Sequence, residues 1–306
     1  MFMDAPVSAP QYSIVVAVYN DWVLLDDCLR SLAEQASAPS FEVIVVDDGS
    51  RQTAPESIRH WTRCCPLTII RQCHAGISAA RNRGLQISRG SVMVFADADC
   101  RFQANCLAAL ASAVARSPQH DCFQLHLSGD CSGTVGRAEQ LRLITFQHHM
   151  LQPDGCIRYL NTAGFAIRKT RVDIARGLFN PMALRAEDTL LLVDLMKGGE
   201  LPFFVADATV QHVIPLSLID CIRKDARSAY LERTAYNIIA SRGVRIRVSH
   251  RERIRMLLSM WKTSGEDNIG RLAWFVLVGR QTLQRTLSFV CWCFRVRPSS
   301  HLANSS

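Results

Sequence analysis

Two pairs of carboxylates offer the clearest chemistry in this chain. Asp47 and Asp48 follow one apolar, β-branched segment, and Asp97 and Asp99 end another. Short segments of this kind are typical of buried parallel strands. Ligands bind just beyond the carboxyl ends of such strands in an open α/β sheet, so both pairs are expected to face one crevice.

The second pair has the spacing of a metal site. Asp97 and Asp99 place two hard oxygen ligands one residue apart, which suits a divalent cation that also carries phosphates. The sequence therefore predicts an enzyme that handles a metal–nucleotide, with Mg²⁺ or Mn²⁺ as the cofactor.

The elements that must position these carboxylates alternate along the chain. Apolar runs predict strands at 13–20, 42–47, 67–70 and 91–96, and helical periodicity predicts helices at 22–36, 77–88 and 103–116. Strand–helix alternation with short turns is typical of a mainly parallel sheet flanked by helices. Farther along, we expect strands at 121–127 and 163–168, helices at 137–150 and 186–198, and a strand pair at 203–213 that ends at His212.

The charge divides the chain of 306 residues into two parts. Residues 1–215 hold 19 Lys and Arg against 21 Asp and Glu, whereas residues 216–306 hold 16 against 6. The last third is therefore a basic extension, which we expect to be helical. A basic tail fits an anionic surface. A membrane surface is favoured over nucleic acid, because no nucleic-acid-binding motif is present.

Residues 272–294 are long enough to span a membrane, but Arg280 and Arg285 interrupt them, and a mid-span Arg is costly. The segment is instead predicted to be an amphipathic helix. It could lie in the bilayer interface or pack on the catalytic domain, and both alternatives stay open here. The N-terminus lacks the features of a signal peptide, and the twelve irregularly spaced cysteines are typical of reduced thiols. We therefore expect a cytoplasmic chain, with peripheral contact to the inner face of the plasma membrane as the alternative.

Six ordered pieces resemble the inverting glycosyltransferases of family 2, which have the GT-A fold. They are Val15-Val-Ala-Val-Tyr-Asn20, Val45-Val-Asp-Asp-Gly-Ser50, Gly76-Ile-Ser-Ala-Ala-Arg-Asn-Arg-Gly84, Phe95-Ala-Asp-Ala-Asp99, Asn161-Thr-Ala-Gly-Phe-Ala-Ile-Arg168 and Glu187-Asp188. The resemblance covers about residues 12–215. It implies the GT-A nucleotide-diphospho-sugar transferase fold, with residues 216–306 as a C-terminal helical extension.

The resemblance implies a donor site in the first half of the chain. Ala17, Tyr19 and Asp48 would hold the nucleoside, and a carboxylate such as Asp48 can accept a hydrogen bond from a base N–H. Gly76 and Arg81 would lie near the phosphates or the sugar. Two alternatives stay open: the acidic pair before Gly49 can be a simple turn cap, and a lone Arg is more often a surface charge.

The resemblance also assigns the metal. Asp99 would be a direct ligand, and Asp97 would be a second ligand or would contact ribose or a metal-bound water. His212 could contact the metal or the diphosphate, as a histidine near this point does in some relatives, or it could be a strand-end core histidine.

Asp188 would be the general base, because an inverting transfer needs a carboxylate that takes the proton of the acceptor hydroxyl. Its neighbour Glu187 would orient the acceptor. The alternative is an ordinary acidic helix N-terminus, which the helix dipole favours. Related chains often carry Asp two residues after the base and Arg six after it, whereas this chain has Leu190 and Asp194, which puts the acceptor pocket in doubt.

These observations predict one catalytic domain over residues 1–215, with a donor half over about 12–100 and an acceptor half over 101–215. It would move a single sugar from a nucleotide-diphosphate sugar, with UDP-sugar favoured, to a hydroxyl of a glycan or lipid-linked acceptor. The alternatives are a nucleotidyltransferase and a sugar-nucleotide-binding protein without catalysis. A nucleotidyltransferase should carry a Gly-rich phosphate loop after its first strand, and Tyr19-Asn20-Asp21-Trp22 has none.

Overall fold

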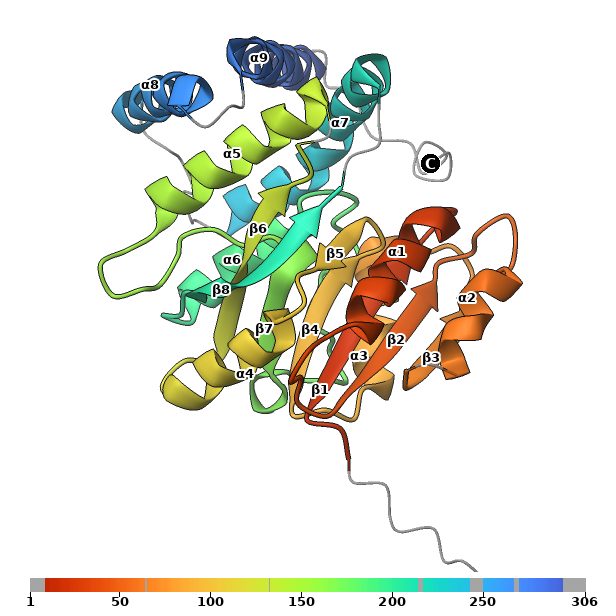
Figure 1. The fold of residues 1–306 in the computed structure, drawn as a ribbon. Helices are drawn as coiled ribbons and strands as arrows, with labels where there is room; N and C mark the ends of the chain where they lie inside the picture. The colour runs from red at the N-terminus through yellow and green to blue at the C-terminus, as the bar shows by residue number, and fades with distance from the viewer. Residues whose placement is uncertain are drawn as a thin grey trace, which may run out of the picture.

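The computed structural model describes residues 9–63, 65–131, 133–213, 217–242, 250–266 and 270–293. All other residues lie outside the described residues, among them 1–8 of the predicted catalytic domain and 294–306 of the predicted extension. A twisted sheet forms the centre, helices cover both faces, and three further helices lie along one side (Figure 1).

The first half of the sheet is parallel. Its strands occur in the order β3-β2-β1-β4, and their carboxyl ends therefore meet at one edge, as expected from the apolar runs. The helices α1, α2 and α3 and the short 3₁₀ helix η1 connect them. The bounds are β1 (Tyr12–Val18), α1 (Trp22–Ala33), β2 (Phe41–Asp47), α2 (Glu56–His60), η1 (Trp61–Arg63), β3 (Leu67–Arg71), α3 (Ile77–Ile87) and β4 (Val92–Asp97).

The second half of the sheet mixes directions. The order continues β4-β7-β6-β8-β5, where β7 is antiparallel to β4 and β6, β8 is parallel to β6, and β5 is antiparallel to β8. The elements are β5 (Cys100–Phe102), α4 (Cys106–Arg116), β6 (Cys122–Gly129), α5 (Thr134–Met150), η2 (Thr162–Gly164), β7 (Phe165–Arg168), η3 (Lys169–Arg171), α6 (Glu187–Lys197) and β8 (Phe203–His212).

Two details of this half differ from the sequence-based expectation. The predicted strand pair at 203–213 is a single strand, β8 (Phe203–His212), because one irregularity in its register with β6 near Leu125 bends it without breaking it. The three-residue strand β5 escaped prediction, because Cys100–Phe102 is too short to show an alternating pattern.

Close packing of α3 on the sheet fixes the site. Gly84 faces β1, where an added Cβ would lie 2.3 Å from Cγ1 of Val15. A side chain at this position would push α3 away from the sheet. Because Arg81 lies one turn earlier on the same helix, this contact also sets how far Arg81 reaches across the sheet edge.

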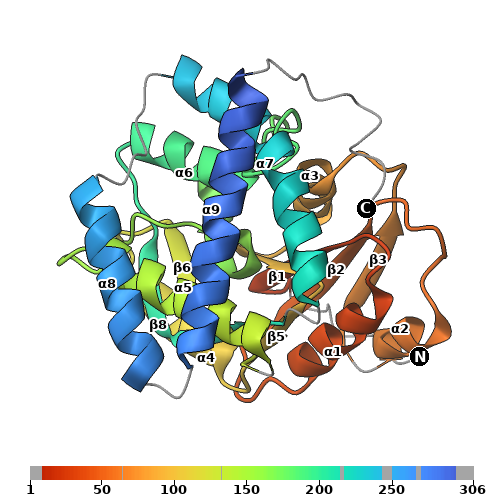
Figure 2. The same ribbon diagram turned by 90° about the horizontal axis from the view of Figure 1, so that it is seen from above.

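Three helices follow the sheet: α7 (Leu218–Ser241), α8 (His250–Glu266) and α9 (Arg271–Cys293). Seen from above, α9 crosses the molecule between α7 and α8 (Figure 2), and both α8 and α9 pack on α5. Helical structure is thus confirmed for the described part of the extension. No helix in the described segments is long and apolar enough to cross a bilayer.

The structure shows that the described part of the amphipathic segment at 272–294 packs on the protein, which is one of its two predicted alternatives. The helix α9 packs on the protein, and its polar side contacts α7: Arg280 pairs with Asp225 at 2.7 Å, and Gln284 donates to Glu232 at 2.9 Å. The polar side of α9 thus faces inward, because α7 supplies carboxylates that pair with it.

Candidate active site

The strand edges bring the predicted donor residues together. Ala17 is the register partner of Asp97 across β1 and β4, and Asp48 follows β2 on the other side, where its backbone N–H donates to Val18 O at 2.9 Å. Three segments that are distant in sequence therefore end at one place, as parallel pairing requires.

Asp48 holds the loop that leads into α3. Its Oδ1 accepts hydrogen bonds from Gln72 Nε2 at 2.7 Å and from the N–H of Ala75 at 2.9 Å, and its Oδ2 accepts one from the N–H of Gly76 at 2.9 Å. Gly76 is the N-cap of α3 and has φ +89°, a conformation that favours glycine. The structure thus gives both residues a part in shaping the loop, and their predicted nucleotide contacts stay predictions.

Tyr19 lies against the same loop. Its ring stacks on His74 with centroids 4.4 Å apart, and His74 Nδ1 is 2.9 Å from Oδ2 of Asp48. The stack joins the tip of β1 to the loop before α3. A flat, half-buried aromatic pair beside a carboxylate is a suitable wall for a planar base.

Asp47 lines a cavity that its neighbour Asp48 does not line. The cavity holds about 490 Å³ and is lined by Asp47, Arg71, Ile69 and residues of α2 and its flanks. Asp47 Oδ1 accepts from the N–H of Ser50 at 2.8 Å, which is the turn-capping role that the sequence left open.

Arg81 is the most buried charged side chain of the site. It has no solvent exposure, and its guanidinium donates from Nη2 to Asp97 at 2.5 Å and from Nη1 to Glu187 at 2.6 Å. Burial lowers its pKa, but Asp97 and Glu187 outweigh that effect and raise it above the ordinary value. Arg81 is therefore a permanent cation that ties the end of β4 to the start of α6, which excludes the surface alternative.

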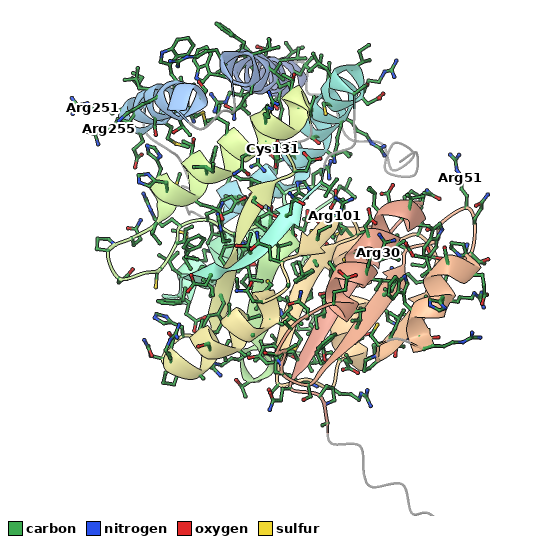
Figure 3. All side chains as sticks on the ribbon, in the orientation of Figure 1. Arg30, Arg51, Arg101, Cys131, Arg251 and Arg255 are labelled. Atoms are coloured by element: carbon green, nitrogen blue, oxygen red, sulfur yellow. The ribbon has the colours of Figure 1, made fainter. Side chains whose placement is uncertain are left out.

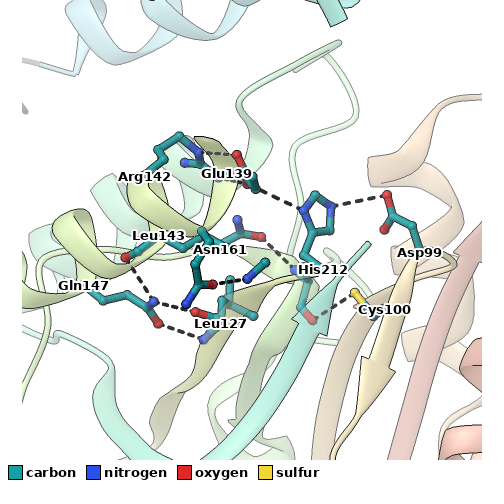
Figure 4. Close-up of polar contacts among 12 residues, drawn as sticks. Asp99, Cys100, Leu127, Glu139, Arg142, Leu143, Gln147, Asn161 and His212 are labelled. Carbon is teal, nitrogen blue, oxygen red and sulfur yellow. Dashed lines mark hydrogen bonds and ion pairs between the residues drawn. The ribbon is translucent and has the colours of Figure 1, made fainter. Parts of the chain in front are cut away.

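Asp99 belongs to a second chain of charges, drawn in Figure 4. Its Oδ2 is 3.2 Å from Nε2 of His212, whose Nδ1 is 3.6 Å from Glu139. Glu139 in turn forms a close ion pair with Arg142 on α5. Burial lowers the pKa of His212, but the two carboxylates raise it to about 10. His212 is therefore a charged, ion-paired residue here rather than a neutral core histidine.

One oxygen of Asp99 suits a cation. Oδ1 of Asp99 is shielded from solvent and accepts no hydrogen bond from the described residues, and an orphaned carboxylate oxygen is costly unless a ligand satisfies it. Within the described segments, no three His, Cys, Asp or Glu side chains form a ready-made metal cluster. The orphaned oxygen of Asp99, beside Asp97, is chemically suited to a hard divalent cation.

Asp188 is the second residue of α6, after Glu187. The N-cap residue Ala186 has a φ of +56°, which is unusual for a residue with a side chain. Oδ1 of Asp188 accepts from the N–H of Thr189 at 2.6 Å. Burial, followed by the charge of Glu187, raises the pKa of Asp188 to about 6. A carboxylate with this pKa accepts a proton more readily than an ordinary aspartate does.

Comparison with known proteins identifies this arrangement. The model of glycosyl transferase family 2 matches residues 13–176, more than half of the chain. The chain belongs to glycosyltransferase family 2. Matched relatives include EpsH of Bacillus subtilis, which is 33% identical over 30% of this chain and 27% of its own length. Glycosyltransferase AglE of Haloferax volcanii is 33% identical over 30% and 31%. The match thus spans about a third or less of these relatives.

Solved structures share the fold of this family 2 chain. The mannosyltransferase PcManGT of Pyrobaculum calidifontis, in complex with GDP-Man and Mn²⁺, aligns with 97% of this chain and 79% of its own at 18% identity and a TM-score of 0.57. A fragment of S. aureus TarS in complex with UDP aligns with 93% and 92% at 16% identity and a TM-score of 0.56. The α/β fold with C-terminal helices is therefore confirmed as GT-A.

Sequence reasoning missed Glu139 and Arg142 in this family 2 site. Both lie on α5, and Glu139 is 40 positions from Asp99, in a segment that none of the six pieces includes. A signal was nevertheless present, because an acid and a base three residues apart share one side of a helix. Nothing in the sequence tells that this side faces His212.

Proposed function

We propose that this chain is an inverting glycosyltransferase that moves a single sugar from a UDP-sugar to an acceptor hydroxyl. The observation that supports the proposal is the contact of Arg81 with both Asp97 and Glu187. It joins the carboxylates of the proposed donor half to the helix that carries Asp188. Direct displacement needs both reactants held side by side, and this contact would hold the two halves of the site together for it.

The proposed reaction assigns work to the residues of the chain. Asp188, with its pKa raised to about 6, takes the proton of the acceptor hydroxyl as its oxygen attacks the anomeric carbon. Tyr19, Ala17 and Asp48 hold the nucleoside, and Gly76 lies near the phosphates. Glu187 orients the acceptor from its fixed position on Arg81.

Asp97 and Asp99 would hold a divalent cation, Mg²⁺ or Mn²⁺, which supplies charge neutralisation for the departing diphosphate. The orphaned oxygen of Asp99 supports this assignment. His212 reaches the same carboxylate. In its charged form it is proposed to contact the diphosphate, and it could bind the metal only after losing its proton. Arg81 and His212, both cationic, balance the acidic pair when no nucleotide is present.

We further propose that the acceptor is a glycan or a lipid-linked precursor, and that residues 1–215 form the catalytic domain. The enzyme would work in the cytoplasm, with residues 216–306 touching the inner face of the plasma membrane. The charge of this extension, 16 basic against 6 acidic residues, supports the contact.

Calorimetric titration with UDP, GDP, dTDP and their sugars tests the donor site, in Mn²⁺, in Mg²⁺ and in EDTA. We expect metal-dependent binding of one nucleotide class, with UDP favoured, and its loss in Asp99→Ala. A folded protein that binds none of them would contradict the transferase proposal. A nucleotidyltransferase would instead transfer a nucleoside monophosphate from a nucleoside triphosphate to a sugar phosphate, with release of pyrophosphate.

Asp188→Asn separates catalysis from binding. Loss of a general base lowers the rate of transfer by about 10²–10⁴-fold, whereas donor affinity should stay at the wild-type level. The measurement is release of the nucleoside diphosphate with an acceptor present. Equal release by both proteins would show that Asp188 is not the base, and no release by either would favour a binding protein.

A further inference from the structure

The outward side of α8 is apolar. Ile254, Leu257, Leu258 and Trp261 are exposed by 59%, 37%, 65% and 40%, and their spacing of i, i+3, i+4 and i+7 places them on one side of the helix. The opposite side, with Met256 and Met260, is buried. The helix α8 therefore has two apolar sides: one is buried on the protein, and the other stays largely exposed apart from Trp261, which contacts Trp274 and Arg271 of the next helix.

The helix α9 continues this surface. Leu272, Phe275, Phe289 and Val290 are exposed by 63%, 57%, 63% and 41% and share one side of α9. The ring of Phe275 lies 6.1 Å from that of Trp261, so the two helices present one joined surface. We call it the outer face, and it consists of Ile254, Leu257, Leu258, Trp261, Leu272 and Phe275. Phe289 and Val290 lie about four turns farther along α9, beyond the exposed Thr282 and Thr286.

One polar side of α9 lies against α7 rather than in solvent. Arg280 donates two hydrogen bonds to Asp225, at 2.7 and 3.0 Å, and Gln284 donates one to Glu232. Ordinary surface helices turn polar residues outward and apolar residues inward. The helix α9 departs from this pattern only in part, because Ala273 and Leu277 are buried against α5 while Leu272 and Phe275 remain outward.

The charges beside the outer face are basic. Arg251 and Arg255 project from α8 away from the rest of the protein (Figure 3), one turn apart along the edge of the apolar row, and Lys262 continues the same edge. Glu252 lies on the other edge of α8, 3.6 Å from Arg158, and residues 271–293 contain no Asp or Glu. An apolar row with a basic edge is typical of helices that lie in an anionic bilayer interface.

We propose that the outer face docks on a lipid bilayer that carries anionic headgroups. The apolar side chains enter the interface, the tryptophan ring lies at headgroup level, and Arg251 and Arg255 contact the phosphates. A second copy of the chain fits less well, because a two-fold contact would bring like charges together. The inference rests on the proposed membrane contact of residues 216–306 and does not depend on the transfer reaction.

The docked orientation also suits a lipid-linked acceptor. The strands β1, β2 and β4 point their carboxyl ends toward the side of the molecule on which α8 and α9 lie (Figure 1). Docking through the outer face would therefore turn the edge with Asp97 and Asp99 toward the membrane rather than away from it.

The test is co-sedimentation of the full chain with vesicles of phosphatidylcholine, alone or mixed with phosphatidylglycerol. We expect binding to the mixed vesicles only, and a loss of about tenfold or more in Ile254→Gln/Leu258→Gln/Leu272→Gln. The matched control is Val23→Gln, an 82% exposed valine on α1, which should bind like the wild type. Arg251→Gln/Arg255→Gln should lose the preference for phosphatidylglycerol.

Thermal unfolding and nucleotide titration of each variant show whether it is folded, and neither readout needs lipid. Vesicle binding that is equal in the triple variant and the wild type would overturn the proposal. So would a wild-type protein that ignores anionic vesicles, or one that is a dimer while the triple variant is a monomer. Failure to bind any nucleotide would contradict the transferase proposal but would leave the vesicle result readable.

Discussion

Asp97 and Asp99 are two positions apart, yet their surroundings differ. Asp97 is held by Arg81, at 2.5 Å, and Arg81 has no solvent exposure. Asp99 is held by His212, at 3.2 Å, and His212 is 18% exposed. Arginine keeps its proton throughout the pH range of folded proteins, whereas His212 owes its charge to its two carboxylate partners, which raise its pKa to about 10.

The different partners of Asp97 and Asp99 indicate different roles for the two carboxylates. Arg81 also binds Glu187, so Asp97 belongs to a rigid connection between β4 and α6. Asp99 keeps one oxygen without a partner among the described residues. Its partner His212 also forms an ion pair with Glu139. We infer that Asp97 chiefly maintains the geometry of the site and that Asp99 is the carboxylate more available to an incoming cation.

The largest effect is expected from Arg81→Met. This change leaves Asp97 and Glu187 without their shared cation, and removal of one partner from a buried ion pair costs about 3–5 kcal/mol of unfolding free energy. Urea denaturation at neutral pH measures the loss. Arg81→Lys is the control: it keeps the charge but lacks the planar fork that reaches both carboxylates, so it should recover only part of the stability.

If Arg81→Lys were as stable as the wild type, charge alone would hold the connection and the geometry of the guanidinium would not matter. If Arg81→Met were also stable, Asp97 and Glu187 would not depend on Arg81, and the contrast between the two carboxylates would disappear.

The second prediction compares the two carboxylates directly. Asp99→Asn should weaken Mn²⁺-dependent nucleotide binding by about ten- to a hundredfold, because a metal site loses a charged ligand. Asp97→Asn should chiefly lower the unfolding free energy, because Arg81 loses one of its two partners. Calorimetric titration and urea denaturation of both variants separate these effects. The reverse pattern would exchange the roles assigned to the two residues.

The sequence predicted the parallel half of the sheet well, because β1, β2 and β4 are β-branched apolar runs that can hardly do anything else. It also named Asp97, Asp99, Glu187 and Asp188, which the structure arranges around two cations. The direct pairing of Arg81 with Glu187 could not be foreseen, because 106 positions separate the two residues and no local pattern reports a contact at that distance.

The ion-pair network that joins Asp99 through His212 to Glu139 could not be predicted for a related reason. Glu139 lies on a helix whose predicted start, near 137, gave no indication of which side would face β8. The sequence also could not show which side of α9 would face the protein. A helical wheel identified its polar side correctly, but only the positions of Asp225 and Glu232 on α7 show that this side faces inward.

The third prediction concerns stability at Asp188. Its pKa of about 6 exceeds the ordinary value of 3.8, so the folded state holds this proton more tightly than the unfolded chain, and ionisation destabilises the fold as pH rises between these values. Asp188→Asn should therefore raise the unfolding free energy at neutral pH by roughly 1–3 kcal/mol. Thermal unfolding between pH 4 and 8 measures it.

The gain should be largest above about pH 6 and should shrink toward pH 4, as the wild-type carboxyl takes up its proton. The kcat/KM of the wild type should fall below about pH 6 for the same reason. A pH-independent gain would mean that the charge of Asp188 is not the cause.

The smallest effect is expected from Glu139→Gln. This variant keeps an acceptor for Arg142 and His212 but removes the charge, and Arg142 and His212 are 28% and 18% exposed, so solvent screens part of the loss. We expect a loss of about 1–2 kcal/mol and a lower pKa for His212, followed by NMR. The pKa of Glu139 lies well below its ordinary value, so the loss should vanish as the pH falls through the acid range. A loss as large as that of Arg81→Met would show that both carboxylates depend on equally rigid partners.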